Sequence, residues 1–403
     1  MRRLKGLFSA YIADFKIAFA ENIAIFTADF AENSMAVYIY QLKNWPDFQW
    51  DREKLALQLT EVRHRQGRLL GRMEGMGFHL QAEANLHTIT LDVLKSSEIE
   101  GEKLNPDQVR SSVARRLGMD IAGLIPADRH VEGVVEMMLD ATQNYKKALS
   151  DERLFDWHAA MFPAGRSGMH RIVVGRYRDN PKTDPMQVVS GPIGREMVHF
   201  EAPDASLLKK EMNFFFDWFN KEEHTDPVLK AAIAHLWFVT IHPFDDGNGR
   251  IARAITDMQL SRADKSSQRF YSMSAQIRVE RNGYYNILEK TQKDSLDITA
   301  WLKWFLECLD RAVSNTDETL AIVLNKARFW DKHISTPLND RQKLMLNKLL
   351  DGFEGKLTSS KWATITKSSQ DTAGRDINDL VEKDILVKEP GGGRSTSYLL
   401  QGQ

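Results

Sequence analysis

Twelve consecutive residues carry the groups in this sequence that could do chemistry together. They run from His242 to Arg253 and read H-P-F-D-D-G-N-G-R-I-A-R. His242 is the group whose pKa suits proton abstraction near neutrality, and Asp246 could hold a hard cation such as Mg²⁺. Arg250 and Arg253 lie three apart, so on a helix they share one face and can fork onto phosphate oxygens. The set predicts phosphate transfer with a histidine base.

The elements around this stretch are expected to be two helices joined by a glycine turn. An apolar run from Pro227 to Ile241 leads into it, and a second helical run from Ile251 to about Ser261 leaves it. The first N–H groups of a helix lack intrahelical partners and the helix dipole is positive there, so such a joint binds anions well. Gly247 and Gly249 let backbone and ligand approach closely, and the N–H groups around Asn248 can form an anion-binding nest.

The same stretch resembles the pattern H-x-F-x-[D/E]-G-N-G-R-x-x-R of Fic-domain proteins at every specified position. The resemblance implies a mainly helical fold that transfers AMP from ATP onto a Ser, Thr or Tyr hydroxyl of a target protein and of itself. Some relatives, such as Doc, transfer a phosphoryl group instead and resemble a variant with Lys at the position of Gly249. Gly249 therefore favours nucleotidyl transfer.

The resemblance also implies a role for each residue of the motif. His242 takes the proton from the target hydroxyl, which attacks the α-phosphate of ATP, while Asp246 carries Mg²⁺ or Mn²⁺ beside the phosphates. Arg253 orients the γ-phosphate. The residues expected to bind ATP are Gly247, Asn248, Gly249, Arg250 and Arg253, with Tyr284 and Tyr285 beside the adenine.

The two tyrosines rest on a weaker resemblance. Residues 282–288 resemble the aromatic segment that borders the adenine in some relatives, but core packing of Tyr284 or Tyr285 agrees equally well with the sequence. Fic proteins often carry Phe-Arg before the flap, and this chain has Tyr177-Arg178 there, so we assign no role to that pair.

A β-hairpin is expected between Met169 and Phe200, where short β-branched runs are separated by Gly and Pro. In Fic proteins a hairpin called the flap lies over the active site and aligns the target segment by strand addition. Val188 and Val189 are the local candidates for this alignment. His199 and His170 have no evident partners and are interpreted as structural. The predicted strands cover residues 171–175, 186–191 and 197–200.

The segment S-S-E-I-E-G that begins at Ser96 is expected to end a helix, with Gly101 as the stop. It resembles the [S/T]-x-x-x-E-[G/N] inhibitory motif of many Fic proteins, here placed before the catalytic core. A carboxylate in the last helical turn favours a cationic partner, and the resemblance implies that Glu100 pairs with Arg253. Ser96, Glu100 and Gly101 are therefore the expected inhibitory residues. A solvated Glu100 is the alternative.

Composition sets the remaining bounds. The chain has 403 residues, so two or three domains are expected, and its 42% hydrophobic and 27% charged content is ordinary for a soluble globular protein. A net charge of −1 argues against a protein built mainly to hold nucleic acid. The single Cys308 excludes an internal disulfide framework and suits a reducing cytoplasm. No apolar run reaches the ~20 residues of a membrane span.

The expected fold is mainly α, with a Fic-type helical core, the flap hairpin and a C-terminal winged-helix domain. Asp14 and Lys16 interrupt the apolar run near the N-terminus, which argues against a signal peptide. The expected parts are an N-terminal extension of unclear role over 1–43, an N-terminal helical region with the inhibitory helix over 44–110, a Fic catalytic core over 111–335 and a winged-helix-like domain over 336–403.

The winged-helix prediction rests on three helices over 341–350, 358–366 and 369–383, followed by a hairpin of 385–388 with 397–400. From residue 337 onward ten Lys and Arg face nine Asp and Glu. Nonspecific DNA affinity is electrostatic, so protein docking or homodimerisation is favoured over DNA binding.

The sequence favours a protein adenylyltransferase that is inhibited by its own Glu100. The alternatives are a DNA-binding regulator whose inactive Fic core senses a nucleotide, and an inert docking protein. The sequence leaves open which protein is the target and whether Glu100 also supports the reverse reaction, the removal of AMP.

Overall fold

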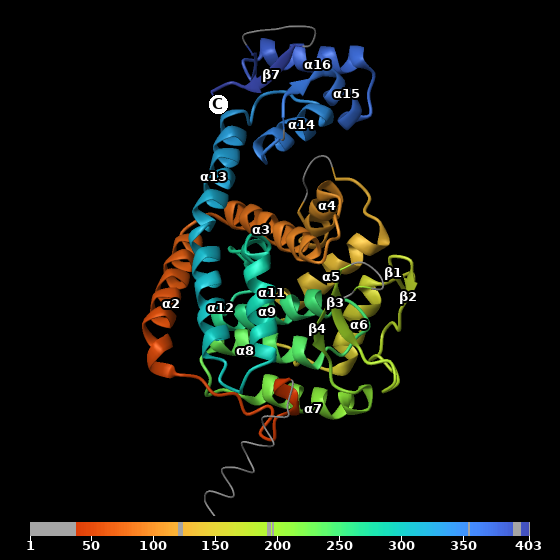
Figure 1. Ribbon diagram of the computed structural model, residues 1–403. Helices are drawn as coiled ribbons and strands as arrows, with labels where there is room; N and C mark the ends of the chain where they lie inside the picture. The colour runs from red at the N-terminus through yellow and green to blue at the C-terminus, as the bar shows by residue number, and fades with distance from the viewer. Residues whose placement is uncertain are drawn as a thin grey trace, which may run out of the picture.

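The computed structural model describes residues 38–402 apart from 120–123, 192–194, 196, 354 and 390–395 (Figure 1). Most of the extension predicted over 1–43 therefore lies outside the described residues. The described chain is mainly helical with small antiparallel sheets, as predicted. None of its described helices has the length and apolar character that a bilayer crossing needs.

Helix α8, Pro227–Ile241, is the central helix of the fold. Asp226 caps it by accepting hydrogen bonds from the N–H groups of Val228 and Leu229, and Pro227 occupies the first turn. All its residues from Val228 to Ile241 are buried, and the helix predicted over this apolar run is confirmed. Helix α9, Asn248–Asp264, packs against α8 and contributes to the same core.

The N-terminal helices belong to that core as well. One continuous cluster of buried side chains reaches from Leu55 to Val323, so the N-terminal helical region and the central helices pack as one body. The first two of these helices are α2, Arg52–Glu74, and α3, Phe78–Ile99. The helices that complete the body are α4, Pro106–Arg116; α5, Arg129–Gln143; α6, Asp151–Met161; α7, Leu208–Lys221; α10, Met273–Val279; α11, Arg281–Gln292; α12, Thr299–Ser314; and α13, Thr316–Lys332.

Two short hairpins lie beside these helices: β1, Arg166–Ser167, with β2, His170–Arg171, and β3, Gln187–Ser190, with β4, Met197–Glu201. The second hairpin is the predicted flap. The strand predicted over 171–175 is wrong, because residues 172–175 form no strand. Two of their N–H groups have side-chain acceptors instead: Val173 donates to the Asp245 carboxylate at 2.8 Å and Gly175 to the Nδ1 of His158 at 3.2 Å.

The C-terminal unit contains the three predicted helices and the predicted hairpin, with one further short strand, β5, that was not predicted, and it has a separate core around Trp362. Its three strands form an antiparallel sheet in the order β5-β7-β6. The loop predicted after Glu389 lies outside the described residues from 390 to 395. The elements are α14, Asp340–Leu350; β5, Leu357–Thr358; α15, Ser359–Thr366; α16, Gln370–Glu382; β6, Leu386–Lys388; and β7, Ser397–Leu400.

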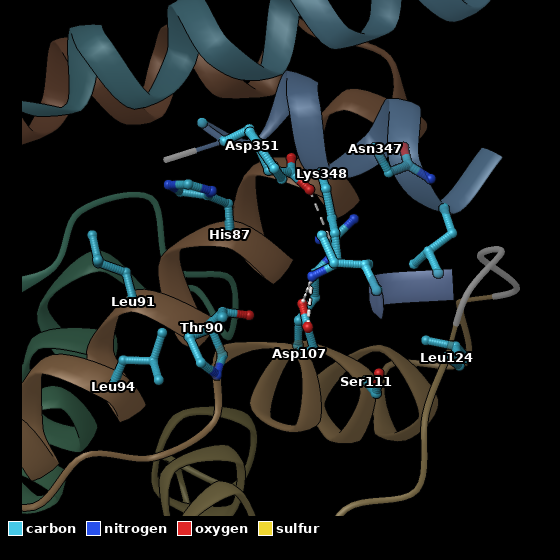
Figure 2. Close-up of a pocket in the computed structure, with 16 residues that line it drawn as sticks. His87, Thr90, Leu91, Leu94, Asp107, Ser111, Leu124, Asn347, Lys348 and Asp351 are labelled. Carbon is cyan, nitrogen blue, oxygen red and sulfur yellow. Dashed lines mark hydrogen bonds and ion pairs between the residues drawn. The ribbon is translucent and has the colours of Figure 1, made fainter. Parts of the chain in front are cut away.

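The C-terminal unit follows α13 and lies over α3 and α4 (Figure 1). Figure 2 shows the seam between them, where Lys348 of α14 reaches Asp107 of α4 with N–O distances of 2.5 and 2.6 Å. A cavity of about 400 Å³ lies in this seam. Asp351 adds a 2.9 Å ion pair with Lys326 and a 3.7 Å contact with Arg110. The unit therefore contacts α4 and α13, and its helix α14 shares the cavity with α3, the helix that carries the predicted inhibitory residues.

Candidate active site

The turn between α8 and α9 is fixed by its own side chains. Gly247 is the N-cap of α9 with φ 83°, a left-handed conformation that glycine adopts without strain. The Asn248 side chain accepts from the N–H of Phe244 at 3.0 Å and donates to its carbonyl at 2.7 Å. Phe244 is fully buried, and its ring stacks on that of His158 with 4.3 Å between the ring centroids. The first N–H groups of α9 are thereby held in place for a ligand.

His242 is the C-cap of α8 and has φ 51°, which is uncommon for a residue other than glycine. Its Nδ1 lies 3.3 Å from the carbonyl oxygen of Val239. A carbonyl only accepts, so Nδ1 carries the proton and Nε2 keeps a lone pair. Burial lowers the pKa of His242 to about 4. The imidazole is therefore neutral at neutral pH and can accept a proton at Nε2.

Arg178 holds the turn from outside, a role that the sequence reading did not assign. Its Nε donates to the carbonyl of His242 at 2.8 Å, and its backbone N–H donates to that of Pro243 at 3.0 Å. A terminal nitrogen of the same guanidinium donates to the carbonyl of Pro203 at 2.5 Å. The sequence signal for this role was the position of Arg178 beside Tyr177, directly before the flap.

Asp246 is the candidate metal ligand, and its carboxylate is partly exposed. It accepts hydrogen bonds from the Ser167 hydroxyl and from the N–H of Gly247. A carboxylate has about four lone-pair sites, so two remain free. Within the described residues no group of three or more His, Cys, Asp or Glu side chains could hold a metal. Mg²⁺ commonly takes one or two carboxylates together with substrate phosphates, so Asp246 alone fits that role.

Arg253 of α9 is buried, with 2% of its surface exposed, and contacts the end of α3. It donates from Nε to the Ser96 hydroxyl at 2.8 Å, and from Nη2 to the Ser96 carbonyl at 2.9 Å and to the Glu100 carboxylate at 2.7 Å. Burial disfavours the charged guanidinium, but Glu100 together with Tyr284 and Tyr285 outweighs burial, so the pKa of Arg253 is raised. Nη1 is buried and finds no acceptor among the described residues. An anionic ligand could supply one.

Glu100 lies directly on the first turn of α9. A Cβ built on Gly249 would stand 2.2 Å from Oε1 of Glu100 and 3.2 Å from Nη1 of Arg253. Only glycine at position 249 allows the carboxylate to come this close. Glu100 caps the C-terminus of α3, and Gly101 follows it with φ 84°, which confirms the predicted helix stop. The carboxylate thus lies where the N–H groups of α9 favour an anion.

A second carboxylate, Glu102, pairs with Arg250, the other arginine of the motif. The sequence analysis assigned no role to Glu102. Arg250 donates to Glu102 at 2.8 Å and lies over the ring of Phe162, 5.0 Å from its centroid. Glu102 also pairs with Nε2 of His130 at 2.6 Å. The hydrogen bond from His130 lowers the pKa of Glu102, and the same bond raises the pKa of His130. Both arginines therefore face carboxylates from the segment that ends α3.

A cavity of about 670 Å³ lies between the flap, α11 and the turn that joins α8 to α9, and Asp246, Gly247, Asn248, Arg250 and Arg253 are not among the residues that line it. The Tyr284 hydroxyl bonds Nε2 of His235 at 2.8 Å inside the core, and only 2% of Tyr284 is exposed. Tyr285 is partly exposed, and its hydroxyl lies 3.4 Å from Glu100. Of the sequence-predicted residues, those that line the cavity are Glu100, Val188, Val189, His242, Gly249, Tyr284 and Tyr285.

His199 of the flap also lines this cavity, and the interpretation that it lacks partners is wrong. Its Nε2 lies 2.6 Å from the Ser190 hydroxyl, and its Nδ1 lies 2.8 Å from the Glu289 carboxylate of α11. These partners are 9 and 90 positions away in the chain.

The chain is similar to proteins of one family. Residues 148–260 match the model of the Fic/DOC family, and residues 38–119 match a domain of unknown function, DUF4172. A protein adenylyltransferase Fic from Aedes aegypti is 28% identical over 226 residues, which cover 55% of this chain and 40% of that relative. One from Nematostella vectensis is 34% identical over 113 residues, 28% of this chain and 25% of that relative. The chain thus matches less than half the length of these curated relatives.

Solved structures also align with the fold. A Fic family protein from Desulfovibrio desulfuricans G20 aligns with a TM-score of 0.45 and 21% identity, over 86% of this chain and 96% of that one. A Fic domain-containing signaling protein from Bacteroides thetaiotaomicron VPI-5482 aligns with a TM-score of 0.48 and 19% identity, over 64% of this chain and 97% of that one.

Proposed function

We propose that this chain is a protein adenylyltransferase, which moves AMP from ATP onto a hydroxyl side chain of a target protein, because residues 148–260 match the model of the Fic/DOC family. The observation that carries the proposal is the placement of His242. Its imidazole is neutral, has a free Nε2 and lines the same cavity as Gly249 at the N-terminus of α9. A base and an anion-binding helix end thus face one space.

In the proposed reaction Nε2 of His242 accepts the proton of the target hydroxyl. The hydroxyl oxygen attacks the α-phosphorus of ATP, the bond to the β-phosphate oxygen breaks, and pyrophosphate leaves. His242 then returns its proton to solvent. The hydrogen bond to Val239 places the proton on Nδ1 and so leaves the lone pair on Nε2.

The phosphates are assigned to the first turn of α9, to Arg250 and to Arg253. The N–H groups of this turn have no intrahelical partners, and the unpaired Nη1 of Arg253 lies next to Gly249. Mg²⁺ or Mn²⁺ bound through Asp246 would neutralise charge that develops on the phosphates. Tyr285, at the wall of the cavity, is the better placed of the two tyrosines to border the adenine, since Tyr284 lies within the core.

We infer that Glu100 inhibits this reaction in the isolated chain. Its carboxylate occupies the first turn of α9 and one terminal nitrogen of Arg253. A phosphate cannot occupy the same place, and two anions side by side repel each other. Productive ATP binding therefore requires that Glu100 move away, which leaves Arg253 free to pair with the nucleotide.

The target is proposed to bind along β3. Within the described residues the flap has two strands only, so β3 pairs with β4 on one side and offers its other edge. Val189 is exposed at 46%, and Val188 and Val189 both line the cavity. An extended target segment added to this edge would bond through its main chain and place a hydroxyl near His242.

The test is transfer of labelled AMP from ATP with Mg²⁺, in wild type beside Glu100→Gly, with peptide mass spectrometry to locate the label. We expect label on the Glu100→Gly chain and little on wild type. Glu100→Gly combined with His242→Ala is the control and should not label a separate target. A Glu100→Gly chain that binds ATP yet transfers no AMP to itself or to any protein added would contradict the proposal.

A further inference from the structure

Three residues of the flap and α11 form a chain of hydrogen bonds that the proposed reaction does not use. The Ser190 hydroxyl at the end of β3 lies 2.6 Å from Nε2 of His199 on β4, and Nδ1 of His199 lies 2.8 Å from the carboxylate of Glu289. Lys293 and His199 both bond this carboxylate and lower the pKa of Glu289, so it stays ionised. An ionised carboxylate only accepts, so Nδ1 of His199 carries a proton. In the neutral imidazole Nε2 then accepts the proton of Ser190.

This polarity is the one that activates a serine. A nucleophilic hydroxyl is bonded to a base, and the base is oriented by a third group, all at 2.6–2.8 Å. A latch that only fixed the flap to α11 would need the pair of His199 and Glu289. It would not need a hydroxyl on the side of His199 that faces away from Glu289.

The cavity adds an electrophile to this arrangement. Ser190, His199 and Glu289 all line the 670 Å³ space that also contains His242 and Gly249, where ATP is assigned. Ser190 is exposed, so its oxygen is accessible. The Tyr284 hydroxyl also meets an imidazole, that of His235, but both are buried in the core, where a phosphate cannot reach the oxygen.

We propose that Ser190 is itself an acceptor of AMP and that His199 is its base. The proposal rests on the proposed adenylyl transfer, which supplies ATP. The Ser190 oxygen attacks the α-phosphorus, its proton passes to Nε2 of His199 and then to solvent, and pyrophosphate leaves. The product is a phosphodiester between Ser190 and AMP. It lies at the end of β3 next to Val189, so it also obstructs the edge proposed for targets.

The experiment uses the full-length Glu100→Gly chain with ATP and Mg²⁺, and follows AMP on the tryptic peptide that ends at Arg195. We expect AMP on Ser190 at a rate that does not depend on protein concentration, since the step is intramolecular. His199→Asn should slow labelling of Ser190 by on the order of 100-fold, the lower range for a general base. His170→Asn is the matched control, because His170 is an exposed histidine on β2, and it should leave the rate unchanged.

His242→Ala in the Glu100→Gly chain separates the two bases. Labelling of Ser190 should persist while transfer to separate proteins is lost. If the rate of AMP labelling of Ser190 falls in His242→Ala and is unchanged in His199→Asn, the role of His199 is overturned. AMP on other residues but never on Ser190 would overturn this inference and leave the proposed function standing, whereas no AMP on any protein would end both. The His199→Asn chain should still transfer AMP to separate proteins through His242, which guards against a misfolded His199 variant.

Discussion

Glu100 and Arg253 are 153 positions apart in the chain, and the carboxylate of one accepts a 2.7 Å hydrogen bond from the guanidinium of the other. The same guanidinium bonds the side chain and the carbonyl of Ser96, so the end of α3 is fixed to the first turns of α9. About 30% of the Glu100 side chain is exposed, whereas Arg253 is buried. Removing the carboxylate therefore leaves Arg253 held in place by Ser96, with its charge available to an anion.

Glu100→Gly is expected to raise the rate of AMP transfer tenfold or more, which corresponds to about 1.4 kcal/mol of barrier. Arg253→Ala in the same background should lose this gain, because the group that uses the freed site is missing. Glu98→Gly is the control for any glycine near the end of α3. Glu98 pairs with Lys95 and not with Arg250 or Arg253, so this change should leave the rate of AMP transfer low. Equal transfer by wild type and Glu100→Gly, with the same ATP and target, would mean that Glu100 does not inhibit.

His242→Ala is expected to abolish transfer to separate targets and to leave ATP affinity within about twofold, because the imidazole moves a proton and holds no phosphate. The low pKa of His242, about 4, keeps it neutral at physiological pH. In the Glu100→Gly chain its contribution to the rate should be level between about pH 6 and 8 and should fall only as pH approaches that pKa. Rates and calorimetric ATP affinities on the two variants check both points, and a rate limb near pH 6.5 assigned to His242 would contradict them.

Acid should destabilise the fold through its buried histidines. Burial lowers the pKa of His158 to about 4 and that of His235 to about 3, both below the ordinary value near 6.5. Between the lowered pKa values and pH 6.5 the unfolded chain binds more protons than the folded chain. The free energy of unfolding is therefore highest above about pH 6.5 and declines as pH falls toward 4. The stability difference between wild type and His158→Asn, from urea unfolding at pH 7 and pH 5, should shrink at pH 5. A difference independent of pH would contradict the assignment.

Glu102→Gln is expected to tighten ATP binding by about fivefold, near 1 kcal/mol, because it weakens the competing partner of Arg250. The figure is modest since Glu102 is partly exposed, at 37% of its side chain. His130→Asn should act in the same direction with a smaller effect, because it removes the group that orients Glu102. Titration of ATP into the Glu100→Gly chain with and without each change measures this. Weaker binding in Glu102→Gln would show that Glu102 supports Arg250 in place of competing with it.

The sequence could predict those parts of the site whose causes are local. Apolar residues all round from Pro227 to Ile241, with Asp226 and Pro227 at the start, define α8 without reference to the rest of the chain. The glycine turn and the residues at the end of α3 follow short patterns, so their positions could be predicted too. Their roles in catalysis and inhibition stay predictions, as do the bounds of the four predicted parts of the chain and a DNA-binding or docking role for the C-terminal unit.

Contacts between distant segments could not be predicted in the same way. Glu102 reaches Arg250 across 148 positions, and His199 reaches Glu289 across 90, with no pattern that marks either pair. The β-branched run at 172–174 failed as a strand for the opposite reason. Its propensity was read correctly, but the Asp245 carboxylate takes the N–H of Val173, so a tertiary contact overrides a local preference.

Helix α3 has one end in the seam with the C-terminal unit and the other on the first turn of α9. It has 22 residues, about 33 Å at 1.5 Å per residue. Near its start Glu83 lies 3.8 Å from Lys326, which pairs with Asp351 of the C-terminal unit, and at its far end lies Glu100. A continuous helix of this length can couple events at its two ends, and any such coupling is reciprocal. If a partner that lifts the C-terminal unit off α3 tightens ATP binding by some factor, then ATP must tighten the binding of that partner by the same factor.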